Sequence, residues 1–346
     1  MNPQEVEKLF AALPKAELHL HLEGAIEPAT VAELAARYGV ALTPEEAAER
    51  YTYSDFTGFL EAFKWVTSLL RAPADYRLVA ERLADRLISQ RVVYAEVTLS
   101  VGVMLRRKQD AEANVAAICE VAAQARVKGL RLSWIFDAVR QFGPRAAMEV
   151  ARCAARMKSG GVVAFGMGGD ELSVPAAEFR AVYDSAAREG LHRVAHAGET
   201  GGAEAVRDAI ELLGAERIGH GIAVMRDEQS MDFLAARRIP LEICVTSNLR
   251  TGALARQLGR AEAEAQDHPL PDFLRRGLCV TLSTDDPAMF HTDLVAEYGQ
   301  ALRLGLQPGE LARIAEMSFE FAFLPPEEKQ PLLEAFRAQR NSQGLL

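Results

Sequence analysis

The chain has 346 residues, of which 39 are basic and 48 acidic, so its formal net charge is −9 at neutral pH. The proportions of hydrophobic residues (49%) and charged residues (25%) are those of an ordinary globular protein, and they exclude disordered, collagen-like and coiled-coil chains. The acidic balance and the absence of a lysine- or arginine-rich run argue against nucleic acid or an anionic membrane as a partner. We therefore expect a small-molecule ligand. The N-terminus lacks a secretory pattern and no apolar run is long enough for a membrane span, which favours a cytoplasmic location.

Eight short runs rich in β-branched and apolar residues predict β-strands. They span residues 17–24, 92–100, 131–139, 162–171, 192–199, 217–224, 240–248 and 279–286. Segments with helical periodicity lie between them, for example 111–129 and 175–190. Strands that alternate with helices form parallel βαβ units, and eight units predict a (β/α)8 TIM barrel of the α/β class, as a single domain over residues 1–346. An open doubly wound sheet is the alternative.

The interval after the first predicted strand, residues 25–91, is too long for one crossover helix. It predicts extra helices inserted on the C-terminal face of the barrel, where barrel active sites are built. Residues 51–65 are rich in tyrosine, phenylalanine and tryptophan. They predict either a lid over the site or a helical subdomain whose aromatic side chains pack only against one another.

Histidine and aspartate side chains occur near the ends of the predicted strands, where a buried polar group needs a partner. His19 and His21 are two residues apart, so on a strand both side chains point to the same face. His196, His220 and Asp285 belong to three other strands. Three imidazoles and a carboxylate are a ligand set that suits Zn²⁺ with one position open for water. We therefore predict one zinc ion per chain, with His19, His21, His196 and Asp285 as its ligands.

A hydrolase with two metal ions is the competing interpretation, because a His-x-His pair on a first strand also serves such enzymes. A carbamylated lysine or a carboxylate at the end of the fourth strand commonly bridges the two ions. The fourth predicted strand contains no lysine, and Lys158 precedes it at the opposite end. A single metal ion is favoured.

Six motifs, taken in order, resemble the adenosine deaminase family over essentially the whole chain. They are PKAELHLHLEGAI (14–26), GGDE (168–171), HAGE (196–199), GHG (219–221), TSN (246–248) and STDDP (283–287). The resemblance implies a zinc-dependent aminohydrolase barrel that replaces the 6-amino group of a purine with oxygen and releases ammonia.

The resemblance also assigns roles to individual residues. The four predicted ligands match those of the family. Glu199 matches the proton donor to purine N1, and His220 matches the group beside the water that the metal activates. Asp286 matches the carboxylate that faces N7, and Gly169 the glycine whose N–H meets N3. Glu23 stands where adenosine deaminases usually hold an aspartate for the ribose 5′-hydroxyl, and its extra methylene puts that contact in doubt.

The chemistry imposes further expectations on two of these residues. Glu199 must be protonated to donate, so we expect burial to raise the pKa of its carboxyl group. His220 is expected to orient the attacking water and either to take its proton or to stabilise the alkoxide. The alternative for His220 is a histidine that only holds a metal ligand in place.

Several positions depart from the adenosine-specific pattern and resemble bacterial branches of the family. These branches act on adenine, on N6-modified adenine nucleotides, or on 6-aminodeoxyfutalosine, an adenine nucleoside of menaquinone synthesis. The GGDE segment favours a nucleoside over free adenine, and adenosine and 6-aminodeoxyfutalosine both stay open. A noncatalytic zinc- or nucleoside-binding protein and a nucleic-acid deaminase are the alternatives from other classes. The presence of Glu199 and His220 disfavours the first, and the net charge disfavours the second.

Overall fold

The computed structural model of the chain describes residues 3–53 and 55–345. The strands are β1 (Lys15–His21), β2 (Val92–Leu99), β3 (Arg131–Val139), β4 (Val162–Gly168), β5 (His192–Ala197), β6 (Arg217–His220), β7 (Leu241–Ile243) and β8 (Val280–Leu282). The α-helices are α1 (Pro3–Ala12), α2 (Pro28–Arg37), α3 (Pro44–Glu49), α4 (Phe56–Thr67), α5 (Pro73–Ser89), α6 (Val101–Arg106), α7 (Ala111–Val127), α8 (Gly143–Arg156), α9 (Arg180–Arg188), α10 (Ala203–Glu211), α11 (Glu228–Arg237), α12 (Val245–Arg250), α13 (Ala253–Leu258), α14 (Leu270–Arg275), α15 (Pro287–Phe290), α16 (Leu294–Arg303), α17 (Pro308–Glu320) and α18 (Pro326–Ser342). Short 3₁₀ helices are η1 (Glu23–Ala25), η2 (Arg140–Phe142), η3 (Lys158–Gly160), η4 (Ala176–Phe179), η5 (Ile222–Arg226) and η6 (Ala265–Asp267).

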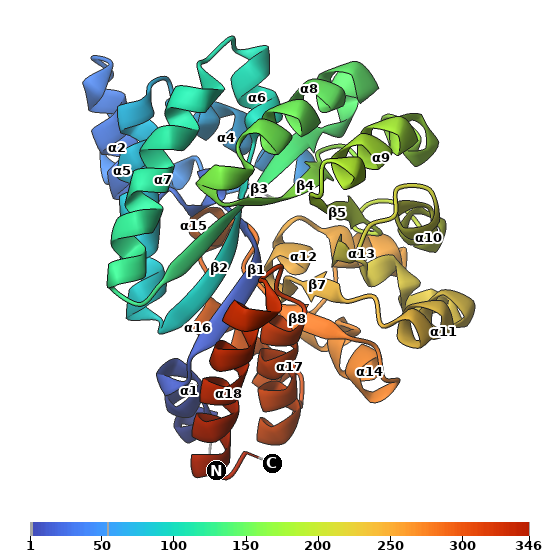
Figure 1. Cartoon of the computed structure of the whole chain (residues 1–346). Coiled ribbons are helices and arrows are strands. Elements are labelled where there is room, and N and C mark those ends of the chain that lie inside the picture. Colours follow the sequence, from blue (N-terminus) through green and yellow to red (C-terminus); the bar gives the residue numbers. More distant parts are fainter. Residues whose placement is uncertain (1–2, 54, 346) are drawn as a thin grey trace.

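The eight strands of the described residues run parallel in the order β1 to β8, with helices around them (Figure 1). Beyond the regular part of β8, the N–H of Asp285 donates to the His19 carbonyl, and the N–H of His21 donates to the Asp285 carbonyl. These bonds and a parallel bridge between Leu20 and Asp285 bring the last strand back to the first. The predicted TIM barrel is therefore confirmed, and the open doubly wound alternative is wrong.

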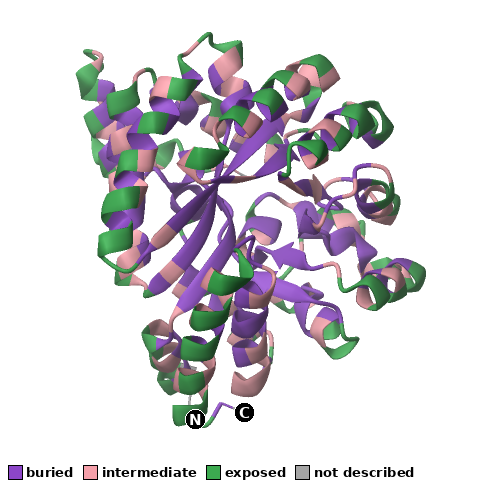
Figure 2. Cartoon of the chain, in the orientation of Figure 1, coloured by how far each residue is buried: buried purple, intermediate pink, exposed green. Residues whose placement is uncertain are grey.

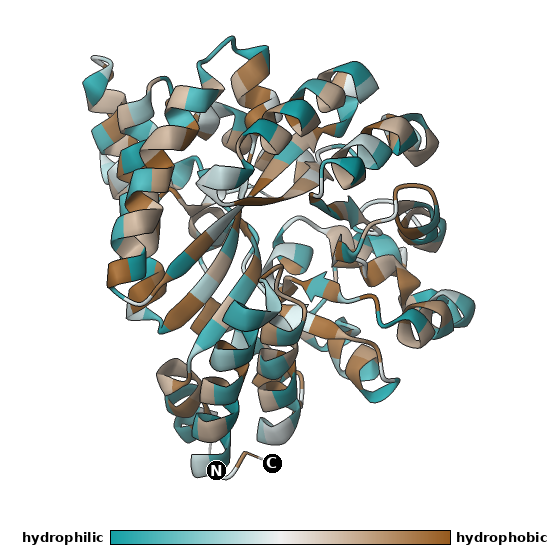
Figure 3. Ribbon diagram, viewed as in Figure 1, coloured by the Kyte–Doolittle hydropathy of each residue, from teal (hydrophilic) through white to brown (hydrophobic). Residues whose placement is uncertain are grey.

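Burial follows the barrel architecture. Figure 2 shows the strands almost wholly buried and the exposed residues on the outer faces of the helices. Figure 3 shows the same division in hydropathy, with hydrophilic residues on the outward helix faces. Parallel strands covered on both faces need apolar side chains in nearly every position, which explains why the strands are near-continuous apolar runs in the sequence. Among the described residues no helix has both the length and the apolarity needed to cross a bilayer.

Seven of the eight strands end earlier than predicted, and only the third ends at the predicted residue. The fourth predicted strand ends at Gly168, and Gly169 has a positive φ of 94° that breaks the extended chain. The sixth ends at His220, which also has a positive φ, and the eighth ends at Leu282. The seventh ends at Ile243 because the chain then enters α12. The TSN motif therefore lies on a helix that follows the strand, and the prediction that it ends the seventh strand is wrong.

Helices α2 to α5 follow β1, as the length of the 25–91 interval predicts. Phe59 of α4 packs against Phe290 of α15, with ring centroids 5.1 Å apart, and the Tyr53 hydroxyl donates to a backbone carbonyl of α15. The aromatic side chains of the insertion thus contact the chain that leaves β8, so the interpretation that they pack only against one another is wrong. Movement of this segment as a lid stays a prediction, and Ser54 lies outside the described residues.

A buried ion-pair network lies inside the barrel below the strand ends. The Arg217 guanidinium is 1% exposed, and it donates to Glu242 at 2.5 Å and to Glu96. It also lies over the Phe323 ring, 3.7 Å from the ring centroid. Removal of one partner from a buried pair leaves an uncompensated charge in the interior.

Replacement of Arg217 by methionine is therefore expected to lower the free energy of unfolding by about 3 to 5 kcal/mol, because two buried carboxylates lose their cation. Denaturant titration followed by circular dichroism measures the change. Arg276→Met is the control, since Arg276 pairs with Glu228 on the surface at 3.2 Å and such pairs contribute about 1 kcal/mol or less. Equal destabilisation by the two substitutions would contradict a structural role for the network.

Candidate metal centre

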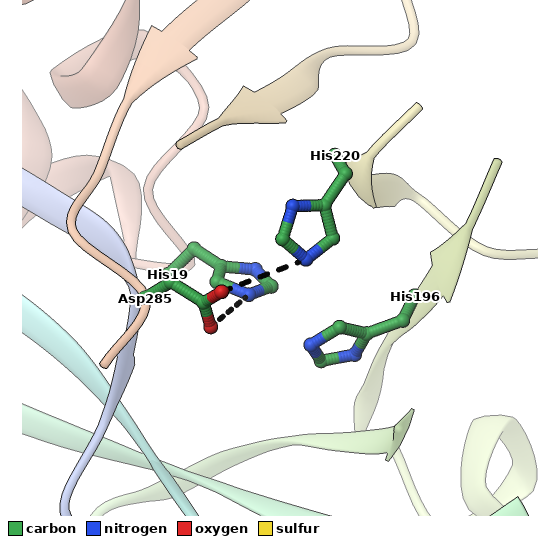
Figure 4. Close-up of side chains that lie close together, drawn as sticks. All are labelled: His19, His196, His220 and Asp285. Carbon is green, nitrogen blue, oxygen red and sulfur yellow. Dashed lines mark ion pairs between the residues drawn. The ribbon is translucent and has the colours of Figure 1, made fainter. Parts of the chain in front are cut away.

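Histidine and aspartate side chains from four parts of the barrel converge at the C-terminal ends of the strands. The possible ligand atoms of His19, His196, His220 and Asp285 all lie within 4.8 Å of one another (Figure 4). His21 belongs to a neighbouring group with Asp285 and Asp286. The structure thus brings three of the four predicted ligands, His19, His196 and Asp285, together with His220, and it places the fourth, His21, against Asp285 in the neighbouring group.

Two imidazole nitrogens of this cluster are buried without a hydrogen-bond partner in the described part of the chain. They are Nε2 of His19 and Nδ1 of His21. Both face the same oxygen, Oδ1 of Asp285, at 3.4 Å and 2.8 Å, without hydrogen-bond geometry. Buried polar atoms are almost always satisfied in native proteins, so a cation between these nitrogens and the carboxylate is the natural partner. The residues present therefore fit a metal ion.

Two other imidazole nitrogens of these residues have partners outside the cluster. The Nδ1 of His19 lies 2.8 Å from a carboxylate oxygen of Glu242, and the Nδ1 of His196 lies 3.3 Å from the Met167 carbonyl. Such contacts are typical of metal-binding histidines, because they orient the other ring nitrogen towards the ion. The Ser247 hydroxyl does the same for Asp285, donating to its Oδ2 at 2.6 Å.

The charges around the cluster also favour a cation. Burial opposes protonation of His19, yet the carboxylates of Asp285 and Glu242 next to its ring outweigh burial and raise its pKa to about 9. The pKa of His21 is raised against burial by Asp286 and Asp285. Carboxylates that hold protons on imidazoles offer the same negative environment to a metal ion, whose binding then releases those protons.

Two residues of the cluster have strained backbones. His220 has φ 62° and Asp285 has φ 65°, a left-handed conformation that non-glycine residues avoid at a cost of about 1 to 2 kcal/mol. His220 is the last residue of β6, and Asp285 follows the end of β8 and forms the isolated bridge to Leu20. Strain of this kind is concentrated at functional sites, where the surrounding structure enforces it.

Glu199 lies on the turn after β5, with its Oε2 3.8 Å from Nε2 of His220. Burial, then Asp285 and Glu171, raise its pKa well above the usual value for glutamate, as the proton-donor hypothesis requires. The Glu171 carboxylate holds this turn by accepting backbone N–H groups at 2.5 to 3.2 Å. The donors are Gly198, Glu199, Thr200 and Gly201.

The three predicted substrate-binding residues differ in their placement. Asp286 lines the cavity next to the cluster, and its Oδ1 has no partner among the described residues. A Cβ on Gly24 would lie 1.8 Å from that oxygen, so only glycine at 24 leaves room for it. Gly169 also lines the cavity. Glu23 is buried beside it and accepts the Ser100 N–H at 2.9 Å, and it is absent from the described residues that line the cavity.

Beyond the histidines and carboxylates, the cavity wall is largely apolar, with Lys64, Ser100 and Gln141 as its polar side chains. The wall includes Phe56, Phe59 and Phe63 of α4 and Phe142 of η2, and Lys64 lies among them. The cavity therefore extends well beyond the cluster of histidines and carboxylates, and the insertion after β1 forms part of its wall.

Sequence reasoning missed several residues that this site uses. Glu242 and Asp137 are buried carboxylates inside the strands LEI and RLSWIFDAV, and the rule that marked the histidines would have marked them too. Asp137 lines the cavity, and burial raises its pKa to about 7. Glu171 was part of a quoted motif, but its contacts with the turn of Glu199 have no local sequence signal.

Comparison with known proteins agrees with this architecture. The family model described as adenosine deaminase matches residues 14–339. The chain belongs to the adenosine deaminase family. Among curated relatives, an aminodeoxyfutalosine deaminase of Streptomyces avermitilis is 41% identical over 93% of this chain and 89% of its own length. An adenine deaminase of Rhizobium leguminosarum bv. trifolii is 33% identical over 93% of this chain and 98% of its own.

Among solved structures, the adenine deaminase of Arthrobacter aurescens has a TM-score of 0.88 and 30% identity, and the match covers 95% of this chain and 100% of that chain. This chain is therefore an adenosine deaminase family barrel that has helices inserted after β1 and a histidine–aspartate cluster at the strand ends.

In this member of the adenosine deaminase family, Ser247→Ala is expected to weaken zinc binding by about 10- to 100-fold, the usual loss when a residue that orients a metal ligand is removed. Competition between the metal-free protein and a chelator for added Zn²⁺ measures the affinity. Ser230→Ala is the control, because Ser230 is equally buried but donates its hydrogen bond to Asp227, which is not part of the metal cluster. An unchanged affinity in Ser247→Ala would refute Asp285 as a ligand.

Proposed function

We propose that this deaminase of adenine-type substrates removes the 6-amino group of an adenine nucleoside by hydrolysis and releases ammonia. One zinc ion, held by His19, His21, His196 and Asp285, is part of the proposal. The observation that carries it is the pair of buried, unpartnered imidazole nitrogens of His19 and His21 that face Asp285, because His21 and Asp285 line the cavity that also contains Glu199.

The residues of the cavity have separate roles in the proposed reaction. When bound, zinc lowers the pKa of water enough to supply a nucleophile at neutral pH. Glu199, kept protonated by burial and by neighbouring carboxylates, donates its proton to the ring nitrogen N1 as water adds to C6. His220 faces the attacking oxygen. Asp286 has an unpartnered Oδ1 on the cavity wall, and burial and the neighbouring Asp285 raise its pKa to about 7, so its protonated carboxyl group donates a hydrogen bond to purine N7. Expulsion of ammonia restores the ring as a 6-oxopurine.

The shape of the cavity supports a nucleoside that is extended beyond C5′. The phenylalanines of α4 and η2 offer more apolar wall than a purine ring needs, and Lys64 adds one positive charge. An extension that is apolar and acidic suits this wall best. The greater identity to aminodeoxyfutalosine deaminases than to adenine deaminases also favours an aminodeoxyfutalosine-like nucleoside.

Glu199→Gln is expected to lower kcat by about 10²- to 10⁴-fold, because an amide cannot donate the proton that N1 requires. The loss of ultraviolet absorbance of the aminopurine measures the rate, and zinc content is measured on the same sample. In the wild type, kcat should fall as pH rises through the raised pKa of Glu199, since the deprotonated carboxylate has no proton to give. A variant that keeps most of its turnover would refute this role.

A substrate panel of adenine, adenosine, 5′-modified adenosines and 6-aminodeoxyfutalosine tests the choice of substrate. We expect turnover of nucleosides and not of free adenine, with 6-aminodeoxyfutalosine preferred. Lys64→Met should raise KM for that substrate up to about fivefold and leave KM for adenosine unchanged, the range expected for an exposed ion pair. Lys128→Met, which removes an exposed lysine paired with Asp85, is the control. Turnover of adenine alone would overturn the preference for a nucleoside.

A further inference from the structure

A line of hydrogen bonds runs behind His220, away from the cavity. Nδ1 of His220 lies 3.0 Å from Nδ2 of Asn248 on α12. Oδ1 of Asn248 lies 3.2 Å from Nε2 of His268, and Nδ1 of His268 accepts the backbone N–H of Leu270 at 3.2 Å. All three side chains are buried, with His220 1% exposed, Asn248 0% and His268 3%.

The direction of every bond in this line follows from its last member. The backbone N–H of Leu270 can only donate, so Nδ1 of His268 is an acceptor and the ring hydrogen of neutral His268 is on Nε2. That hydrogen is donated to the amide oxygen of Asn248, which leaves the NH₂ group of Asn248 facing His220. An amide nitrogen also can only donate. The acceptor is therefore Nδ1 of His220, and the ring hydrogen of neutral His220 is on Nε2.

His268 is suited to keep this direction. It has a single ring hydrogen only while it is neutral, and burial lowers its pKa to about 3. The amide of Asn248 does not titrate at all. The line therefore keeps one polarity at any pH well above 3.

The other end of the line faces the reaction. Nε2 of His220 lies 3.8 Å from Oε2 of Glu199 and 3.8 Å from Oδ2 of Asp285. A nitrogen that carries a hydrogen has no lone pair for a metal ion or for a proton. This explains how His220 lies within ligand distance of the cluster while the ligand set consists of the other three histidines and Asp285.

We propose that Asn248 and His268 are positioning residues that hold His220 as the Nε2–H tautomer, so that His220 donates a hydrogen bond to the attacking oxygen and does not accept its proton. The inference rests on the proposed function. It decides between the two roles that the sequence left open for His220. The hydroxyl proton of the adduct then goes to the carboxylate of Glu199, which has by then given its own proton to N1, and passes from Glu199 to the leaving amino group.

Nitrogen NMR of protein labelled with ¹⁵N-histidine tests the tautomer directly, in the zinc-loaded and the metal-free protein. The chain has seven histidines, and the signals of His220 are those missing from the spectrum of His220→Gln. We expect Nδ1 of His220 to show the shift of an unprotonated nitrogen and Nε2 that of a protonated one. The reverse pattern in the wild type overturns the proposal without any further variant.

Asn248→Asp is the decisive variant, because it replaces a group that donates to His220 with one that accepts. The hydrogen of His220 should move to Nδ1, the two shifts should exchange, and kcat should fall about 10²-fold, as when one donor to a developing oxyanion is lost. Asn114→Asp is the matched control, since Asn114 is also a buried amide but bonds Gln109 on the outer side of the barrel. Unexchanged shifts in Asn248→Asp would overturn the proposal.

A pair of substitutions at His268 separates positioning from mere packing. His268→Gln keeps an N–H donor for Asn248 and should retain the tautomer and most of kcat. His268→Leu removes the donor and should lower kcat with KM little changed, and its His220 signals should show both tautomers. Equal effects of the two substitutions would reduce His268 to a packing residue. If every purine fails as a substrate while the Nε2–H pattern stands, the proposed function fails and the tautomer assignment does not.

Discussion

The carboxylate of Glu242 joins the chemistry at the strand ends to the interior of the barrel. One oxygen bonds the imidazole of His19 and the other bonds the guanidinium of Arg217. A buried carboxylate is tolerated only when its charge is compensated, and Arg217 supplies that compensation. Because Arg217 is shared with Glu96 of β2, the orientation of His19 depends on strands that contribute no ligand of their own. The metal cluster is therefore held by a charge network that extends well below it.

Those parts of the molecule that repeat along the sequence could be predicted from it. Apolar strand segments recur eight times, and the His-x-His spacing places His19 and His21 on one face of a strand because the strand period is two. The lengths of the strands near the site could not be predicted in the same way. His220, at the end of β6, and Asp285, just after β8, have a positive φ, which tertiary contacts enforce against the local preference of these residues.

Contacts between distant segments were also beyond sequence reasoning. His268 precedes a proline in the sequence, and only the fold places it behind Asn248 and next to the amide of Leu270. Glu171 is similar, because its four backbone donors come from a turn that follows the next strand along the chain. The reacting groups belong to residue types at fixed spacing in the sequence. The residues that orient them, such as His268 and Glu171, are found only in the three-dimensional structure.

The position of α15 has a mechanical consequence for the insertion after β1. This one-turn helix begins directly after Asp286 and ends at Phe290, whose ring packs on Phe59 of α4. The Tyr53 hydroxyl is tethered to the same short helix. A displacement of α4 that kept these contacts would move α15. Through α15 it would also move the chain at Asp285, which is little more than one helical turn away. A movement of the aromatic wall would therefore be transmitted to the carboxylate of Asp285 at the centre of the cluster.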